Sequence, residues 1–339
     1  MRPSRILIVT DAWRPQVNGV VRTLATVAQE LTAMGHAVEV IGPDRFATLP
    51  CPTYPDIRLA ILPRRRLARI IEGFDPDALH VATEGPLGLA ASRWARRHEF
   101  PYTTAFHTRF PEYVRARTGL PPGLLYAWLR RFHGFARGTM VATEGLRAEL
   151  AGRGFGHLLR WSRGVDLGLF RPQPAEDWPL QRPIFAYVGR IAVEKNLSAF
   201  LDLDLPGSKL VVGDGPLLPA LRRRYPKVLF TGPRYGEALA RAYAGADVFV
   251  FPSLTDTFGL VVLEALACGT PVAAFPVTGP RDVMAGAQGA IGALDFDLRA
   301  AALSALGADR AACRSHADRF SWRACAETFL ANLALKRPR

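Results

Sequence analysis

Two carboxylates, Asp256 and Glu264, flank the start of a predicted helix. An apolar strand, Val248–Phe251, precedes them, and the helix is expected to run from near Phe258 to Ala267, where glycine and proline follow. The free N–H groups of a helix amino terminus, at the positive end of its dipole, bind phosphate. Carboxylates beside that terminus can accept hydrogen bonds from hydroxyl groups. Phosphate and polyol together suggest a sugar nucleotide.

Two cations lie close behind another predicted strand, Ile184–Val188. Gly189 and Arg190 end that strand, and Lys195 follows five residues later, where the next helix is expected. A guanidinium fork and an ammonium point charge can hold a pyrophosphate between them. The alternative is a pair of ordinary surface cations. Their position at the end of a strand favours the phosphate-binding interpretation.

Two further motifs are less specific by themselves. Asn18 and Gly19, followed by Val20, favour a tight turn that lets backbone approach a ligand, or an ordinary strand-to-helix turn. His107 follows the predicted strand Tyr102–Ala105 and so lies at its carboxyl end. A lone histidine is more often a structural hydrogen-bonding group, but a position at the sheet edge favours a functional one.

No motif for a metal or a dinucleotide is complete. Gly213-Asp-Gly-Pro closes a predicted strand, but it lacks the third glycine of the dinucleotide-binding fingerprint. The four cysteines form no C-x-x-C pair, which argues against a zinc site or a disulfide framework. Three Asp-x-Asp pairs, which could hold a divalent metal, fall in linking segments or on helix flanks and are attributed to chance: Asp75/Asp77, Asp202/Asp204 and Asp295/Asp297.

Short apolar runs alternate with longer amphipathic ones along the whole chain. This alternation predicts parallel sheets flanked by helices, with ligands at the carboxyl ends of the strands. A proline-rich stretch interrupts it and predicts a linker. The fold class is therefore α/β, with two doubly wound, Rossmann-like domains facing each other across a cleft: residues 1–170, a linker at 171–182, and residues 183–318. A C-terminal helix, 319–339, is expected to pack back toward the first domain.

The remaining predicted elements are listed by range. The further strands are Ile6–Thr10, Val38–Ile41, Ala78–Val81, Thr139–Ala142, Lys209–Val212, Val228–Thr231 and Pro271–Ala274, and the helices include Arg22–Met34, Leu87–Arg97 and Glu237–Tyr243.

The composition is that of a globular chain with a strong positive charge. Of 339 residues, 49% are hydrophobic, and the net charge is +13. No apolar run approaches the ~20 residues of a membrane span, and the first one is too short for a signal peptide, so a cytoplasmic location is expected. Residues 1–170 hold 23 arginines against 14 acidic residues and no lysine. That excess reflects either composition alone or an anionic partner, such as nucleic acid or acidic lipid.

One predicted helix mixes aromatic and basic residues at helical spacing. It lies within Gly123–Arg137 and includes Tyr126, Trp128 and Phe135 among several arginines. It is either a packed helix with an arginine-rich solvent face or a patch that rests on a bilayer interface. The run Arg64-Arg65-Arg66 could extend that patch.

In combination, the motifs resemble those of the retaining glycosyltransferases of family 4, which have the two-domain GT-B fold. The resemblance covers nearly the whole chain and rests on Asn18-Gly-Val, His107-Thr, Gly189-Arg with Lys195, Gly213-Asp-Gly-Pro and Asp256 with Glu264 eight residues on. Smaller phrases, such as Thr83-Glu-Gly-Pro-Leu-Gly and Arg163-Gly-Val-Asp, look most like one branch. That branch holds GDP-mannose-dependent α-mannosyltransferases and the sulfoquinovosyl- and glucuronosyl-diacylglycerol synthases.

The resemblance implies a role for each matching residue. Arg190 and Lys195 would bind the donor diphosphate and stabilise the leaving group, and His107 would hydrogen-bond the sugar. Asp256 would hold sugar hydroxyls, where the family usually has glutamate, and Glu264 would grip the ribose. The implied catalytic residues are thus His107, Arg190, Lys195 and Asp256, and the implied donor contacts are Asn18, Gly19, Val20, Gly189, Arg190, Lys195, Gly213, Asp256, Phe258, Gly259, Leu260 and Glu264.

The resemblance also implies no metal and no cofactor beyond the nucleotide-sugar donor. The expected reaction moves a hexose from a GDP- or UDP-sugar to a lipid acceptor, such as diacylglycerol or a glycolipid, at the cytosolic face of a membrane with an anionic surface. The alternatives are a mannosyltransferase acting on a soluble or polysaccharide-precursor acceptor and, from another class, a basic nucleic-acid-binding protein. No nucleic-acid motif supports the last of these, so no nucleic-acid partner is expected.

Overall fold

A computed structural model describes residues 4–16, 18–51, 54–119, 121–174, 176–256 and 258–336 of the chain. Thr257, in the loop predicted to bind the donor, lies outside these residues. The described chain divides into two compact units. Unit 1 comprises the described residues of Met1–Pro111, Leu120–Arg163 and Trp322–Arg339, and unit 2 those of Glu112–Gly119 and Gly164–Ser321.

Unit 1 is built on a six-stranded parallel sheet in the order β2-β1-β5-β6-β7-β8. The strands are β1 (Arg5–Val9), β2 (Ala37–Ile41), β5 (Ala78–Val81), β6 (Tyr102–Phe106), β7 (Gly138–Val141) and β8 (Leu158–Arg160), and β3 (Thr48–Cys51) pairs with β4 (Tyr54–Ala60) in an antiparallel hairpin. The helices are α1 (Gly19–Ala33), α2 (Arg64–Phe74), α3 (Pro86–Arg97), α5 (Gly123–His133), α6 (Glu144–Gly152) and α14 (Trp322–Asn332), with α4 (Phe110–Thr118) crossing the division between the units and the short turn η1 (Pro43–Arg45) after β2.

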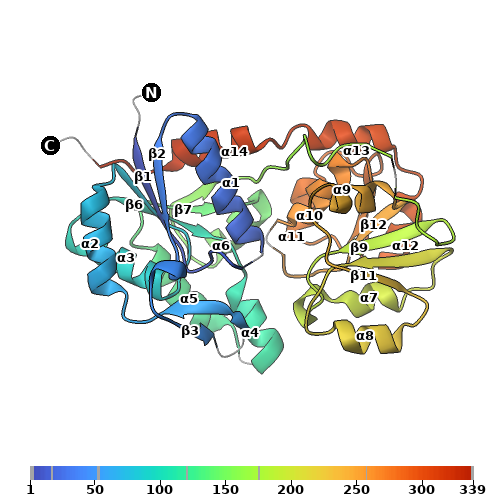
Figure 1. Ribbon diagram of the computed structural model, residues 1–339, viewed down its shortest axis with the longest axis horizontal. Helices are drawn as coiled ribbons and strands as arrows, with labels where there is room; N and C mark the ends of the chain where they lie inside the picture. The colour runs from blue at the N-terminus through green and yellow to red at the C-terminus, as the bar shows by residue number, and fades with distance from the viewer. Residues whose placement is uncertain are drawn as a thin grey trace. The chain divides into compact units, whose positions relative to one another are not determined.

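The two faces of this sheet carry different helices (Figure 1). Leu7 and Val9 point into one core, together with Leu67 of α2 and Leu87 of α3. On the other side of the sheet, α1 packs against α14. Because successive strand residues point to opposite faces, a sheet buried on both sides needs continuous apolar strands. β1 supplies one, since every residue after Arg5 is buried.

Unit 2 is built on a second six-stranded parallel sheet, in the order β11-β10-β9-β12-β13-β14. In chain order this is 3-2-1-4-5-6, the order of dinucleotide-binding folds. The strands are β9 (Ile184–Val188), β10 (Ser208–Val212), β11 (Leu229–Gly232), β12 (Val248–Phe251), β13 (Val272–Ala274) and β14 (Gly292–Leu294). The helices are α7 (Leu197–Leu201), α8 (Leu218–Arg224), α9 (Gly236–Ala244), α10 (Leu260–Ala267), α11 (Thr278–Val283), α12 (Leu298–Ala305) and α13 (Arg310–Ala317), with the short turn η2 (Val193–Lys195) before α7.

The predicted strands are all present, with ends displaced by no more than one residue. Two helix starts differ from expectation. α1 begins at Gly19, three residues before the predicted start at Arg22, so Gly19 is the first residue of the helix. α10 begins at Leu260, two residues after Phe258. The hairpin β3–β4 and the edge strands β8 and β14 were not anticipated. Of these, β3, β8 and β14 have only three or four residues, and strands this short carry little periodic signal. The proline-rich segment 171–182 falls inside unit 2.

Each parallel sheet has one point where the strand order reverses. In unit 1 this switch point lies between β1 and β5, and in unit 2 it lies between β9 and β12. Ligands in open α/β sheets bind outside the carboxyl ends of the strands at such a point. None of the described helices is long and apolar enough to cross a membrane.

Candidate active site

The loops that follow β9 and β12 are tied together at the switch point of unit 2. Lys195 Nζ lies 2.6 and 2.8 Å from the two carboxylate oxygens of Asp256, and both side chains are about one-fifth exposed. Asn196 Nδ2 donates to the carbonyl of Pro252 at 3.2 Å, and Thr255 Oγ1 donates to the carbonyl of Glu194 at 3.3 Å. The ammonium and the carboxylate predicted to share a site are therefore in direct contact.

A buried tyrosine fixes the backbone of the first loop. Tyr187, on β9, donates from Oη to the carbonyl oxygen of Arg190 at 2.8 Å. Burial raises the pKa of the Tyr187 phenol, which keeps it a donor. Gly189 lies between them, and a Cβ there would approach Tyr187 Oη to 2.9 Å. The glycine of the motif therefore leaves room for the Tyr187 ring to pass the backbone at position 189.

The glycines of Gly213-Asp214-Gly215 have a packing role in this structure. A Cβ on Gly213 would overlap the carbonyl oxygen of Gly189, and a Cβ on Gly215 would overlap that of Ile191. The Ile191 N–H donates to the Asp214 carbonyl at 2.8 Å. The loop after β10 thus lies directly against the loop after β9. The donor contact predicted for Gly213 stays a prediction.

The start of α10 has no side-chain cap among the described residues. Its N-cap, Gly259, adopts φ +83°. Phe258 is buried, and its ring contacts Phe320 edge-on. A Cβ on Gly279, which precedes Pro280 in α11, would lie 2.7 Å from the Phe258 carbonyl oxygen. The loop after β13 therefore supports this turn, a contact that no sequence motif indicated.

The two carboxylates of the opening motif differ in their surroundings. Asp256 is partly exposed and pairs with Lys195. Glu264, on the second turn of α10, is 3% exposed and accepts a hydrogen bond from Tyr243 Oη at 2.9 Å. The difference agrees with separate roles, but the roles themselves, sugar for Asp256 and ribose for Glu264, stay predictions.

In unit 1, the predicted residues lie in two places at the carboxyl edge of the sheet. Asn18 is the N-cap of α1, and its Oδ1 accepts from the N–H groups of Val20 and Val21, each at 3.0 Å. His107 follows β6, is 9% exposed and lies 3.2 Å from a guanidinium nitrogen of Arg163. Burial and the charge of Arg163 lower the pKa of His107 well below 6.5.

An aspartate that the sequence did not single out occupies the switch point of unit 1. Asp11 follows β1, and its carboxylate accepts from the N–H groups of Leu87 and Gly88 at 2.8 and 3.2 Å. It also accepts from Thr83 Oγ1 at 2.9 Å. Burial raises the pKa of Asp11, while these hydrogen bonds oppose that rise. The amino end of α3 is therefore filled by the chain's own carboxylate.

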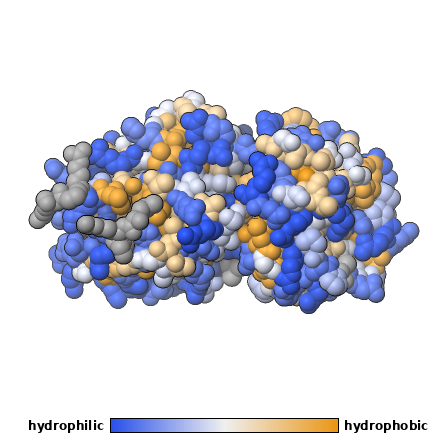
Figure 2. Space-filling model, turned by 90° about the horizontal axis from the view of Figure 1, so that it is seen from above, coloured by the Kyte–Doolittle hydropathy of each residue, from blue (hydrophilic) through white to orange (hydrophobic). Residues whose placement is uncertain are grey.

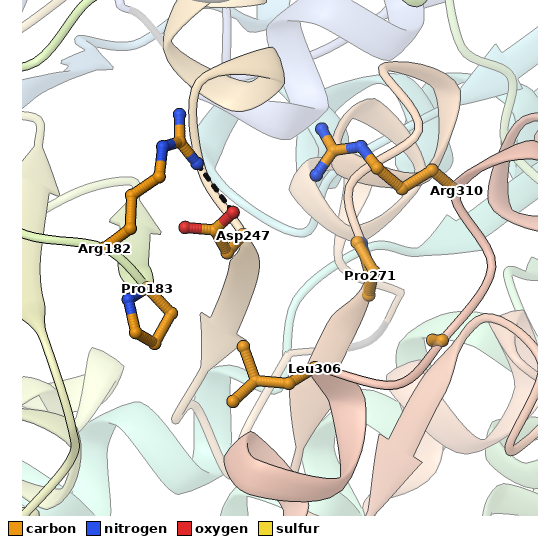
Figure 3. A pocket seen from close by; sticks show the side chains of 7 residues that line it. Arg182, Pro183, Asp247, Pro271, Leu306 and Arg310 are labelled. Carbon is orange, nitrogen blue, oxygen red and sulfur yellow. Dashed lines mark hydrogen bonds and ion pairs between the residues drawn. The ribbon is translucent and has the colours of Figure 1, made fainter.

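Two hollows in the surface lie away from these loops. One of about 370 Å³ in unit 2 is lined by Arg182, Asp247 and Arg310, at the amino ends of β9, β12 and β13 (Figure 3). Arg182 is paired there with Asp247 at 2.6 Å, and Arg310 donates to two backbone carbonyls. Another, of about 750 Å³, lies near the amino ends of β6 and β7 in unit 1. Both are at the sheet edge opposite the switch-point loops.

Within the described residues, no group of three or more His, Cys, Asp and Glu side chains is arranged to hold a metal ion. The Asp-x-Asp pairs have structural partners instead. Asp297 caps α12, Asp202 accepts from Tyr225, and Asp77 accepts from the N–H of Arg5. The four cysteines are reduced thiols.

The whole architecture matches solved glycosyltransferases. A sucrose-phosphate synthase from Thermosynechococcus elongatus superposes with a TM-score of 0.73 over 97% of this chain and 98% of that one, at 20% sequence identity. Two parallel, Rossmann-like units with this likeness define the GT-B fold. A switch point that joins a lysine, a carboxylate and an uncapped helix start is typical of an anion-binding site.

Family models then identify the chain more narrowly. The model described as Glycosyltransferase Family 4 matches residues 17–169, and that described as Glycosyl transferases group 1 matches residues 182–309. A GDP-mannose-dependent alpha-mannosyltransferase from Mycobacterium tuberculosis is 34% identical, with 83% of this chain and 81% of that one covered. The chain belongs to glycosyltransferase family 4 and is a hexosyltransferase that uses a nucleotide sugar.

A second relative is named for a lipid product. The alpha-monoglucosyldiacylglycerol synthase of Streptococcus pneumoniae is 27% identical over 80% of this chain and 70% of that one. The resemblance inferred from the motifs, including its mannosyltransferase branch, is thereby confirmed.

Proposed function

We propose that this glycosyltransferase moves a hexose, with retention and without a metal, from a nucleotide sugar to a lipid acceptor at the cytosolic face of a membrane. The observation that carries the donor half is the contact between Lys195 and Asp256 beside the start of α10. One ammonium, one carboxylate and free backbone N–H groups match one diphosphate and one sugar.

The proposed reaction is a displacement on one face of the sugar. The bond from the anomeric carbon to the diphosphate oxygen breaks, and the acceptor oxygen bonds to the same face. The acceptor proton passes to the departing phosphate oxygen. Negative charge builds on the diphosphate, and Arg190, Lys195 and the start of α10 stabilise it.

Donor binding would rearrange the observed ion pair. Lys195 holds both oxygens of Asp256 in this structure. A diphosphate would compete for the ammonium and so release the carboxylate for sugar hydroxyls. Asp256 would then serve twice, as a holder of Lys195 before binding and as a sugar acceptor after it. The shorter aspartate, in place of glutamate, suits a contact this close.

The relatives guide the choice of donor and acceptor. The name of one relative specifies GDP-mannose, and that of the other specifies a diacylglycerol product. GDP-mannose is therefore the first donor to test, followed by UDP-hexoses and UDP-glucuronate. A membrane glycerolipid is the first acceptor.

The surface of α5 supports contact with a bilayer. Leu124 is 85% exposed, and Trp128 and Phe135 are each about 40% exposed. Arg96 lies over the Phe135 ring, 3.6 Å from its centroid. Exposed apolar side chains among arginines suit the interface of an anionic membrane. By contrast, Figure 2 shows hydrophobic groups scattered among hydrophilic ones on the face that it presents.

A donor panel tests the proposed chemistry. The full chain is incubated with each nucleotide sugar and a membrane lipid extract, and products are read by mass spectrometry, with Lys195→Ala as the slowed control. A hexosylated lipid formed much faster by the wild type than by this variant supports the proposal. Transfer to water-soluble acceptors alone would instead establish the soluble-acceptor alternative.

Vesicle flotation tests the membrane half separately. We expect binding to vesicles that contain anionic phospholipid, weakening as salt rises, because a Debye length shrinks from about 10 Å at 0.1 M to about 3 Å at 1 M. Leu124→Ser with Trp128→Ser should reduce flotation without changing donor hydrolysis. Absence of flotation at low salt would contradict the membrane assignment.

A further inference from the structure

A buried arginine, Arg163, contacts the predicted site residue His107 in unit 1. Its side chain donates from Nη1 to the carbonyls of Trp161 and Ser162, at 2.6 and 3.1 Å. Its Nη2 lies 3.2 Å from His107 Nδ1. The guanidinium also lies over the Trp161 ring, 4.3 Å from the centroid. With Arg163 only 5% exposed, these contacts fix its position.

The C-terminal helix holds the segment that carries this arginine. Trp161 Nε1 donates to the carbonyl of Cys325 at 3.2 Å, and Cys325 Sγ donates to the carbonyl of Ser162 at 3.2 Å. Both contacts come from α14, more than 160 residues further along the chain. The position of Arg163 therefore depends on tertiary contacts of its segment with α14, in addition to its local hydrogen bonds.

The chemistry of the two side chains assigns the proton on His107. A guanidinium has N–H donors only and cannot accept a hydrogen bond. Burial lowers the pKa of Arg163 only to about 10, so the side chain is charged near neutral pH. Nδ1 of His107 must therefore be the acceptor in this contact. A neutral imidazole that accepts at Nδ1 carries its proton on Nε2.

The surroundings of His107 disfavour its protonated form. Burial lowers its pKa most, and Arg163, His80 and His133 lower it further. The nearby carboxylate of Glu84 faces His133, at 3.2 Å from its Nε2. The imidazole of His107 is thus held neutral by its own surroundings.

We propose that Arg163 is a positioning residue that fixes His107 as the neutral Nε2–H tautomer, so that this N–H donates to an oxygen of the donor sugar. The proton assignment stands on the geometry of unit 1 alone, whereas the use of the N–H rests on the proposed function. A neutral donor can hydrogen-bond the sugar without placing a positive charge beside the oxocarbenium-like transition state.

The wild-type tautomer is measured directly by long-range ¹H–¹⁵N spectra of the full chain labelled at histidine nitrogens, recorded from pH 6 to 8. The His107→Gln variant assigns the signal. We expect the Nε2–H pattern for His107, unchanged over that range. An Nδ1–H pattern, or a titration near pH 6.5, would overturn the proposal. This measurement does not depend on whether any variant folds.

A pair of variants tests the role of Arg163. In Arg163→Met, we expect His107 to show both neutral tautomers, because the donor that fixes Nδ1 as the acceptor is lost. The matched control is Arg160→Met, which removes the same charge from a half-exposed position paired with Glu144. It should leave the His107 signal unchanged. A pure Nε2–H signal in folded Arg163→Met would remove Arg163 from the assignment.

Failure of this inference and failure of the proposed function are distinguishable. An Nε2–H tautomer in a chain that transfers no sugar would keep the proton assignment and reject the function. Active transfer with His107 titrating near pH 6.5 would keep the function and reject the role of Arg163.

Discussion

The helix starts at the two switch points of this molecule differ in whether a carboxylate of the chain accepts hydrogen bonds from their N–H groups. In unit 1, the start of α3 is filled by the Asp11 carboxylate, which accepts two backbone N–H groups. In unit 2, the start of α10 has no described side-chain cap, and its neighbouring carboxylate, Asp256, pairs with Lys195 instead. A parallel α/β sheet thus offers an anion site by its topology. What decides its use is whether the chain supplies an anion of its own.

The largest difference between the two switch points should appear in Lys195→Ala. We expect transfer to slow by roughly 10²–10³, because a fixed group that stabilises the developing charge is lost. The fold should stay intact, since Lys195 lies on a short turn and is partly exposed. Initial rates are compared with Lys227→Ala, an exposed lysine of the same unit. Wild-type turnover in Lys195→Ala would contradict the assignment of the donor site to the start of α10.

Gly213→Ala tests the packing of the loops after β9 and β10 in unit 2 without removing a charged group. The added methyl would overlap the Gly189 backbone, so we expect the free energy of unfolding to fall by roughly 3 kcal/mol, at the upper end for overpacking. Urea unfolding measures it. Gly73→Ala, in α2 where a Cβ meets nothing within 4 Å, is the control and should be neutral or stabilising. Equal stabilities would mean that the two loops are not packed as described.

Asp11→Ala tests the filled terminus. Removing this buried acceptor leaves the N–H groups of Leu87 and Gly88 unpaired, so the free energy of unfolding should fall by roughly 1–3 kcal/mol. Asp11→Asn keeps one acceptor oxygen and should lose less. The folded variants should bind nucleotide sugar with an affinity near that of the wild type. Unchanged stability with lost donor binding would reverse the assignment, making the Asp11 site functional.

Tyr243→Phe should have the smallest effect. It removes the hydrogen bond to buried Glu264, at a cost of about 1 kcal/mol in thermal or urea unfolding. Tyr225→Phe, which loses a hydrogen bond to exposed Asp202, is the matched control and should cost less, because solvent replaces that partner. If both changes cost the same, Glu264 is not held by Tyr243, and its predicted position toward the ribose loses its support.

Much of the fold could be predicted from the sequence because its strands are buried on both faces. Val248–Phe251 and Ile184–Val188 are continuous apolar runs, and both strands form with the predicted ends. The alternation of such runs with amphipathic ones indicated two parallel sheets. Short edge strands such as Leu158–Arg160 were not predicted, since half-buried strands of this length have no distinctive sequence pattern.

The candidate site was predicted unevenly. The cations and carboxylates of unit 2 follow strand ends, so their meeting at one sheet edge could be anticipated from strand order alone. Gly213 was placed correctly at that edge, but its contact with the Gly189 backbone could not be foreseen. Asn18 was expected in a tight turn or in an ordinary strand-to-helix turn, and the structure has it in the latter, where its side chain caps α1.

The sequence by itself determined the class of this protein, because residue types and their local spacing specify strands, helix starts and the groups that end them. Only the tertiary structure decided which of those side chains and helix starts are paired with another group of the chain. Asp11 reaches Leu87 and Gly88, and Arg163 reaches His107, across separations of more than 50 residues. Such pairings depend on strand order, helix docking and burial, which no local pattern encodes.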